Sequence, residues 1–178
     1  MGAYGLRPNQ KLHLNPHNHM KTDNLPSDAP IRMYTQAVKT KPKSSVVKWV
    51  IEGQLARGRR PGFEFNHGRQ TPKSVVDAWI KEAKAQGIRS VICILDERKL
   101  RFYESLKMDL PSYYRSKGLQ VVHVNAPNFR QPPLSDEHLI QAVCAYQKLR
   151  KPVLVHCNAG IARTGMVVRY IKLYAPVL

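Results

Sequence analysis

Residues 151–174, KPVLVHCNAGIARTGMVVRYIKLY, constrain the fold more than any other part of the chain. The run PVLVH is short, continuous and apolar, which is typical of a strand buried on both faces. A glycine-containing loop follows, and TGMVVRYIKLY then has the composition and spacing of a helix. A buried strand that leads through a short loop into a helix is the repeating unit of parallel α/β folds.

The preceding residues alternate in the same way. Three segments have the apolar, β-branched composition of strands: 46–51 (VVKWVI), 90–95 (SVICIL) and 119–126 (LQVVHVNA). Three segments have helical spacing over all or part of their length: 71–88, 96–118 and 134–150. We therefore expect an α/β fold with a central, mainly parallel sheet flanked by helices on both faces.

The two longer helices carry start signals. Thr71 is the expected N-cap of the first, with Pro72 in its first turn, and Ser135 is the expected N-cap of the second. In the second helix four apolar residues are expected to face inward: Leu139, Ile140, Val143 and Leu149. Residues 56–70, which are basic and rich in glycine, are predicted to form a loop.

The chain has 178 residues, which suits one domain with a proper core. Residues 1–44 have neither helical nor strand spacing, so we expect a basic, loosely ordered N-terminal arm followed by a folded domain at 45–178. No apolar run approaches the length of about 18 residues needed to span a membrane. The protein is therefore expected in an aqueous compartment.

Three cysteines, Cys93, Cys144 and Cys157, are too few to suggest a disulfide framework. This favours the cytoplasm or another reducing intracellular compartment. Cys93 and Cys144 lie in apolar runs and are expected to be small buried hydrophobic residues. Cys157 alone has polar, glycine-rich neighbours, so it is the candidate for chemistry.

Lys and Arg number 29 against 12 Asp and Glu, which gives a net charge of +17. Such a charge attracts polyanions, so RNA or phosphoinositide contact through a basic surface is one expectation and simple solubility is the other. The basic positions of the first loop, and Arg130 further on, either form a cationic rim around a site or are solvated. The loop positions are Arg57, Arg59, Arg60, His67 and Arg69.

A loop that links a strand to a helix directs its backbone N–H groups toward one point at the positive end of the helix dipole. Residues 157–163 therefore predict a cradle for a tetrahedral oxyanion. In that field the thiolate of Cys157 is stabilised and becomes a nucleophile, and Arg163 can hold two oxygens of a phosphate. Thr164 can hydrogen-bond the sulfur, while the ring of His156 more plausibly orders the loop than acts as a base.

The sequence HCNAGIARTG has the Cys-x5-Arg spacing and closely resembles the active-site loop of the protein tyrosine phosphatase superfamily, and its compact dual-specificity phosphatases in particular. IEGQLARGRRPG and SVICILDER are similar to the opening strand and the central strand of that core. The similarity extends over roughly residues 46–174.

The resemblance implies a cysteine-dependent phosphatase that hydrolyses phosphate monoesters, most readily those of phosphorylated proteins, through a phosphocysteine intermediate. Cys157, Arg163 and Thr164 would be catalytic, and no metal or cofactor would be needed. The residues expected to bind the phosphate are Asn158, Ala159, Gly160, Ile161, Ala162 and Arg163.

The general acid is missing from its expected place. In the family an aspartate lies about thirty residues before the cysteine, and this chain has Asn128 there. Asp96, at the end of a predicted strand, and Asp136, at the start of a predicted helix, are the alternatives, although a salt bridge and a helix-dipole contact are their simpler roles.

Without an acid, the chain would act slowly or only on good leaving groups. This leaves three functions open beside protein dephosphorylation: an RNA 5′-phosphatase or triphosphatase, a phosphoinositide phosphatase, and a weakly active phosphate-binding module.

Overall fold

The computed structural model describes residues 45–65, 70–127 and 131–175. Their core is a five-stranded sheet in the order β1-β2-β5-β3-β4. Only β1 runs antiparallel to its neighbour, and the other four strands are parallel. The strands are β1 (Lys48–Ile51), β2 (Leu55–Arg59), β3 (Ser90–Ile94), β4 (Gln120–Val124) and β5 (Val153–Cys157). The expected central, mainly parallel sheet is confirmed.

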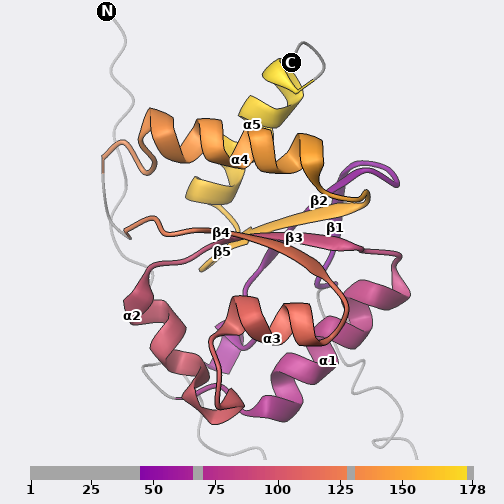
Figure 1. The fold of residues 1–178 in the computed structure, drawn as a ribbon, viewed down its shortest axis with the longest axis vertical. Helices are drawn as coiled ribbons and strands as arrows, with labels where there is room; N and C mark the ends of the chain where they lie inside the picture. The colour runs from indigo at the N-terminus through magenta and orange to yellow at the C-terminus, as the bar shows by residue number, and fades with distance from the viewer. Residues whose placement is uncertain (1–44, 66–69, 128–130, 176–178) are drawn as a thin grey trace, which may run out of the picture. The chain divides into compact units, whose positions relative to one another are not determined.

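Helices cover both faces of the sheet, as expected (Figure 1). One face packs against α4 (Asp136–Lys148) and α5 (Ala162–Tyr174), and the other against α1 (Lys73–Ala85) and α3 (Leu110–Ser116). Three short elements complete the described fold: η2 (Phe63–Phe65), α2 (Glu97–Leu100) and η3 (Arg101–Leu106).

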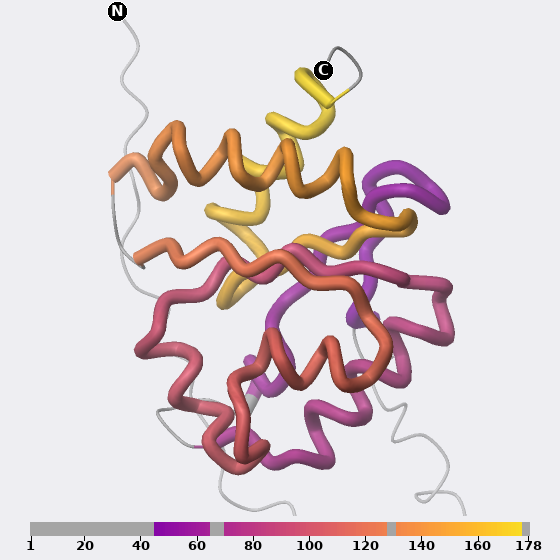
Figure 2. The backbone as a smooth tube through the Cα atoms, viewed as in Figure 1, coloured from indigo at the N-terminus to yellow at the C-terminus, as the bar shows by residue number. Residues whose placement is uncertain are grey.

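The central strand β5 is buried along its whole length, and its side chains alternate between the two cores. Val155 and Cys157 belong to the α4/α5 core, whereas Leu154 belongs to the α1/α3 core. The chain then turns back at the end of β5 to enter α5, at the same edge of the sheet where β3 and β4 end (Figure 2). Parallel strands thus bring several loops together at the end of β5.

One predicted loop was partly wrong. Residues 56–59, placed in a basic loop, belong to β2, which pairs with both β1 and β5. Glycine is required at position 58, because a Cβ there would lie 2.5 Å from the carbonyl oxygen of Val46. The arginines on either side of Gly58 are only half-buried, so their long side chains keep contact with solvent while the backbone pairs.

Two details of the helices also differ. Helix α1 has Pro72, not Thr71, as its N-cap, and Thr71 is fully buried. In α4, Ile140 was expected inside but is 63 % exposed. Leu139, Ala142, Val143 and Tyr146 already fill the buried stripe with helical spacing, and Ile140 lies one residue beyond it. Cys144, also in α4, is half-buried rather than fully inside. Among the described residues, every helix is too short or too polar to cross a bilayer.

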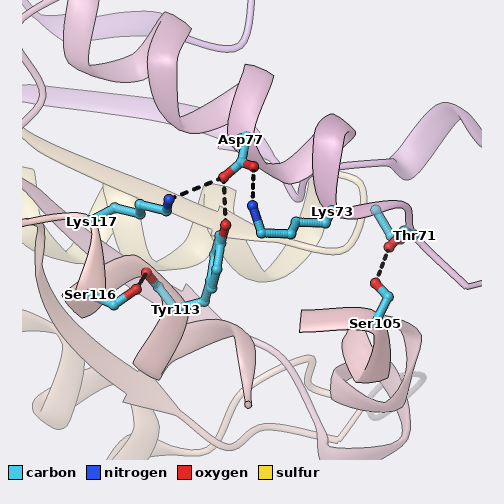
Figure 3. A network of polar contacts seen from close by, with 7 residues as sticks. All are labelled: Thr71, Lys73, Asp77, Ser105, Tyr113, Ser116 and Lys117. Carbon is cyan, nitrogen blue, oxygen red and sulfur yellow. Dashed lines mark hydrogen bonds and ion pairs between the residues drawn. The ribbon is translucent and has the colours of Figure 1, made fainter. Parts of the chain in front are cut away.

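Helices α1 and α3 are joined at the surface by the carboxylate of Asp77 (Figure 3). Lys73 lies 2.7 Å from it within α1, and from α3 the hydroxyl of Tyr113 donates to it over 2.6 Å. Just beyond α3, Lys117 Nζ lies 3.6 Å away. The hydrogen bond from Lys73, followed by that from Tyr113, lowers the pKa of Asp77 to about 2. This cluster therefore favours the charged carboxylate in the folded state.

Asp77→Asn should lower the free energy of unfolding at pH 7 by less than about 1 kcal/mol, because the pairs are more than a third exposed and screened by water. Since the pKa is lowered in the folded state, the stabilisation is complete above the ordinary pKa of 3.8 and is lost as pH falls through about 2. Urea denaturation at pH 7 and pH 3 measures it, with Glu52→Gln in the exposed β1–β2 turn as the control. A difference between wild type and Asp77→Asn that grows on acidification would contradict the assignment.

Candidate active site

The signature loop, residues 158–161, lies between the end of β5 and the first turn of α5. The strand before it is held between β2 and β3, so the loop starts from the centre of the sheet. Within the described residues, the backbone N–H groups of Ala159, Gly160 and Ile161 donate to no acceptor. Unpaired amides beside a helix N-terminus are the donors that an oxyanion requires.

The three side chains expected to do chemistry are buried at the two ends of this loop. Cys157 and Arg163 are each 4 % exposed, and Thr164 is fully buried. The hydroxyl of Thr164 has no hydrogen-bond partner in the described part of the chain. A buried hydroxyl without a partner is uncommon in folded proteins, so this one is available to a sulfur or phosphate oxygen.

Arg163 is directed toward the segment that follows β4. Its Nη1 donates to the carbonyl oxygen of Ala126 over 2.7 Å. This hydrogen bond anchors one nitrogen of the guanidinium to the segment after β4. Cys157, Arg163 and that segment therefore meet at one place. The planar fork suits a ligand with two oxygens.

Strand β2 holds the signature loop from outside. Gly160 has a φ of 71°, and a Cβ there would lie 2.2 Å from the carbonyl oxygen of Gly58. Only glycine therefore fits at position 160 without a shift of backbone. Arg57 Nη2 donates to the carbonyl oxygen of Gly160 over 2.5 Å, which fixes that peptide from the β2 side.

Arg60 holds the first half of the same loop. Its Nε donates to Asn158 Oδ1 over 2.7 Å, and its backbone N–H donates to the carbonyl oxygen of Asn158. The side chain is only 2 % exposed, and its Nη1 contacts the hydroxyl of Tyr103 and the carbonyl oxygen of Pro61. Arg60 is thus a buried cation whose recorded partners in the described chain are neutral groups.

His156 points away from the signature loop, into the α1/α3 core. It is fully buried, Nε2 lies 3.2 Å from the hydroxyl of Tyr114, and Nδ1 lies 3.3 Å from the carbonyl oxygen of Cys157. Its ring also packs edge-on against Trp79 and Tyr114. Burial lowers the pKa of His156 to about 4, so the ring is neutral at pH 7. These contacts support the prediction that it orders the loop rather than acts as a base.

Comparison with family models matches residues 46–175 to the family described as "DSP-PTPase phosphatase fused to NAD+ Kinase". The chain belongs to this family. It is therefore a phosphatase domain of the dual-specificity type, a branch of the protein tyrosine phosphatase superfamily, as its Cys-x5-Arg loop predicted.

Among solved structures, 11 chains match this phosphatase domain. One is the core catalytic domain of the PP-IP phosphatase SIW14 from S. cerevisiae, in complex with citrate. It is 16 % identical with a TM-score of 0.43, and the match covers 68 % of this chain and 61 % of that chain. The phosphatase domain thus spans less than two thirds of SIW14's solved chain. A comparison with curated proteins finds no match.

The candidate acids of this phosphatase domain lie in different places. Asp96 follows β3, is 7 % exposed, and caps α2 by accepting the backbone N–H of Lys99 at Oδ1 over 2.9 Å. Asp136 lies in the first turn of α4, where its charge suits the helix dipole. Asn128 lies outside the described residues. Asp96 is thus the candidate that the sheet carries to the end of a strand adjacent to β5.

The basic segment after β1 contains two kinds of residue. Arg57 and Arg60 contact the signature loop directly, whereas Arg59 pairs with Glu64 at the surface. Arg60 was expected either on a cationic rim around the site or in solvent. Both interpretations were wrong, because its side chain is buried. His67, Arg69 and Arg130 lie outside the described residues. Among the described residues no three His, Cys, Asp or Glu side chains gather as a metal site.

No sequence pattern distinguishes Tyr103 and Tyr114, which support the loop from the α1/α3 side. Tyr103 donates its hydroxyl to the carbonyl oxygen of Pro61 and meets Arg60, and Tyr114 meets His156. Both rings are fully buried. A tyrosine in an amphipathic segment indicates that its ring can be buried. It does not reveal which distant residue the hydroxyl contacts.

Arg60→Met should lower the free energy of unfolding by about 1.5–3 kcal/mol, because it removes charge-assisted hydrogen bonds and leaves Asn158 Oδ1 without its buried donor. Urea denaturation measures the loss. Arg89→Met, at an exposed arginine, is the matched control and should change stability by less than about 0.5 kcal/mol. Equal effects of the two substitutions would show that Arg60 does not hold the loop.

Proposed function

We propose that this domain is a cysteine-dependent phosphatase that hydrolyses phosphate monoesters through a phosphocysteine formed on Cys157. The observation that carries the proposal is the juxtaposition at the end of the central strand. Cys157 and Arg163 are buried at the two ends of a loop whose N–H groups at 159–161 lack acceptors in the described chain. The family match supports the same reaction.

In the first step the thiolate of Cys157 attacks phosphorus, and the bond from phosphorus to the ester oxygen breaks. The signature-loop amides and the guanidinium of Arg163 bind the non-bridging oxygens of the phosphoryl group. These donors stabilise the negative charge on those oxygens in the transition state. The leaving alkoxide takes a proton from a general acid. The product alcohol then departs and the phosphoryl group remains on sulfur.

In the second step water attacks the phosphocysteine and gives a proton to the carboxylate that the general acid left behind, and the phosphorus–sulfur bond breaks to give inorganic phosphate. Thr164, whose hydroxyl has no partner among the described residues, donates it to the departing sulfur, which stabilises the thiolate. The same amides and Arg163 hold the phosphoryl oxygens again. Cys157 therefore ends the cycle as the thiolate with which it began.

Cys157→Ser should abolish hydrolysis of p-nitrophenyl phosphate, because an alcohol is a far weaker nucleophile than a thiolate at neutral pH. Arg163→Lys should lower kcat by about 10²-fold or more, since a point charge does not replace the two-pronged contact. Steady-state kinetics of the full chain measure both effects.

Arg169→Lys, a matched arginine in the same helix, is the control for Arg163→Lys and should keep kcat within about twofold, because its side chain is exposed. Binding of inorganic phosphate by the wild type without any turnover would instead favour the weakly active phosphate-binding module, one of the functions that the sequence leaves open.

For the general acid we propose Asp96. Among the described residues it is the one carboxylate within two residues of the end of a strand adjacent to β5, the strand that ends in Cys157. Capping of α2 uses Oδ1 and fixes the direction of the side chain. Proton transfer to the leaving oxygen would come from this held carboxyl group.

Asp96→Asn should lower kcat on a phosphoserine peptide by about 10²-fold, because an alkoxide leaving group needs a proton, while hydrolysis of p-nitrophenyl phosphate changes by less than about threefold. Asparagine is also a good N-cap, so the substitution keeps the local fold. Asp109→Asn is the matched control, since Asp109 caps α3 in the same way. Equal behaviour of the two variants on both substrates would exclude Asp96 as the acid.

A phosphorylated protein is the substrate that the dual-specificity resemblance predicts. The phosphoserine peptide, a phosphotyrosine peptide and single-stranded RNA bearing a 5′-phosphate or 5′-triphosphate therefore form the first substrate comparison. Cys157 would attack phosphorus in each of them, but in the 5′-triphosphate the bond broken is a phosphoanhydride and the leaving group is a diphosphate rather than an alkoxide.

A further inference from the structure

A cleft lies beside the signature loop and strands β1 and β2, with a volume of about 580 Å³. That volume is within the range of small-molecule sites. The residues that line it include three from the loop and three cations: Ala159, Gly160, Ile161, Lys48, Arg57 and Arg59. We propose that this cleft binds a second phosphate group of the substrate, one that is not cleaved.

The described charged residues that line the cleft are all positive. No carboxylate is among the described residues that line it. Arg59 pairs with Glu64 over 2.7 Å, but the two side chains are 36 % and 59 % exposed, so water screens the pair and it contributes little. In addition, no Asp or Glu follows Glu137 in the sequence, so the loop and α5 offer no counter-charge of their own.

Two of the cations face each other across the β1–β2 ladder. Lys48 and Arg57 are direct partners in the antiparallel register, which places their side chains on the same face of the sheet. Like charges at directly opposed positions destabilise a strand pair. A phosphate between them would relieve that repulsion and gain charge-assisted hydrogen bonds from both.

Arg57 connects this cleft to the catalytic loop. Its Nη2 donates to the carbonyl oxygen of Gly160, and the same half-buried side chain lines the cleft. A held guanidinium loses less side-chain freedom when it binds an oxyanion. The scissile phosphate and the second phosphate would thus both lie against the signature loop.

This arrangement suits a small ester, such as a sugar or nucleoside, that carries two or more phosphate groups. The inference rests on the proposed function, because the signature loop is taken as the site of the scissile phosphate. Phosphopeptides and RNA are the competing substrate classes, and the experiment includes both.

The test is calorimetric binding to the full-length Cys157→Ser variant, which does not depend on turnover. The ligand pairs are fructose 6-phosphate with fructose 1,6-bisphosphate, and adenosine 5′-phosphate with adenosine 3′,5′-bisphosphate. At least one bisphosphate should bind about tenfold more tightly than its monophosphate, with a preference that weakens as salt rises. Adding Lys48→Gln should reduce that preference about three- to tenfold, because it removes one of two facing cations.

Lys81→Gln in α1, an exposed lysine outside the cleft, is the matched control and should leave the preference unchanged. Equal binding of both members of each pair, or a preference that survives Lys48→Gln, overturns the second-phosphate site. A phosphoserine peptide or 5′-phosphorylated RNA that depends on Lys48 more strongly than either bisphosphate overturns the assignment to a small ester. Failure of the wild type to hydrolyse p-nitrophenyl phosphate would instead count against the proposed reaction. The binding measurements would still show whether the cleft holds a second phosphate.

Discussion

The contact between Gly160 and Gly58 is the constraint on which the site depends. The loop after β5 passes so close to β2 that no side chain fits at position 160. Arg57 then fixes the peptide of Gly160, and Arg60 fixes Asn158. These contacts hold the loop just before the start of α5, and within the described residues its N–H groups at 159–161 keep no acceptor. Because these contacts order the loop before a ligand binds, less of the binding free energy is lost in ordering it.

The cations around this loop are held chiefly by neutral acceptors. Arg60 contacts an amide oxygen, a carbonyl oxygen and a tyrosine hydroxyl, Arg57 contacts a carbonyl oxygen, and Arg163 contacts the carbonyl oxygen of Ala126. The neutral acceptors of Arg57 and Arg60 fix the geometry of these two guanidinium groups and leave their charge effective at the loop.

Sequence patterns predicted the sheet, the helices on both faces and the loop with Cys157 and Arg163, because continuous apolar runs and a fixed Cys-to-Arg spacing are local signals. The β2 strand was missed, since Arg57 and Arg59 obscure a pairing that β1 and β5 impose from both sides. Ile140 was placed inside because its helix offers more apolar residues than the core can accept. Arg60 is buried because it contacts Tyr103 and Asn158, which lie 43 and 98 positions further along the chain. No local sequence pattern reveals such distant partners.

The central claim is that the sulfur of Cys157 carries the phosphoryl group during turnover. The most direct measurement is rapid denaturation of the wild-type chain with detergent during hydrolysis of a radiolabelled phosphate ester, followed by peptide mapping of the bound label at alkaline pH. The account predicts a label on the peptide that contains Cys157, and on no other peptide, and that mild acid releases it. Product formation without any labelled protein, or a label on a different residue, would contradict it.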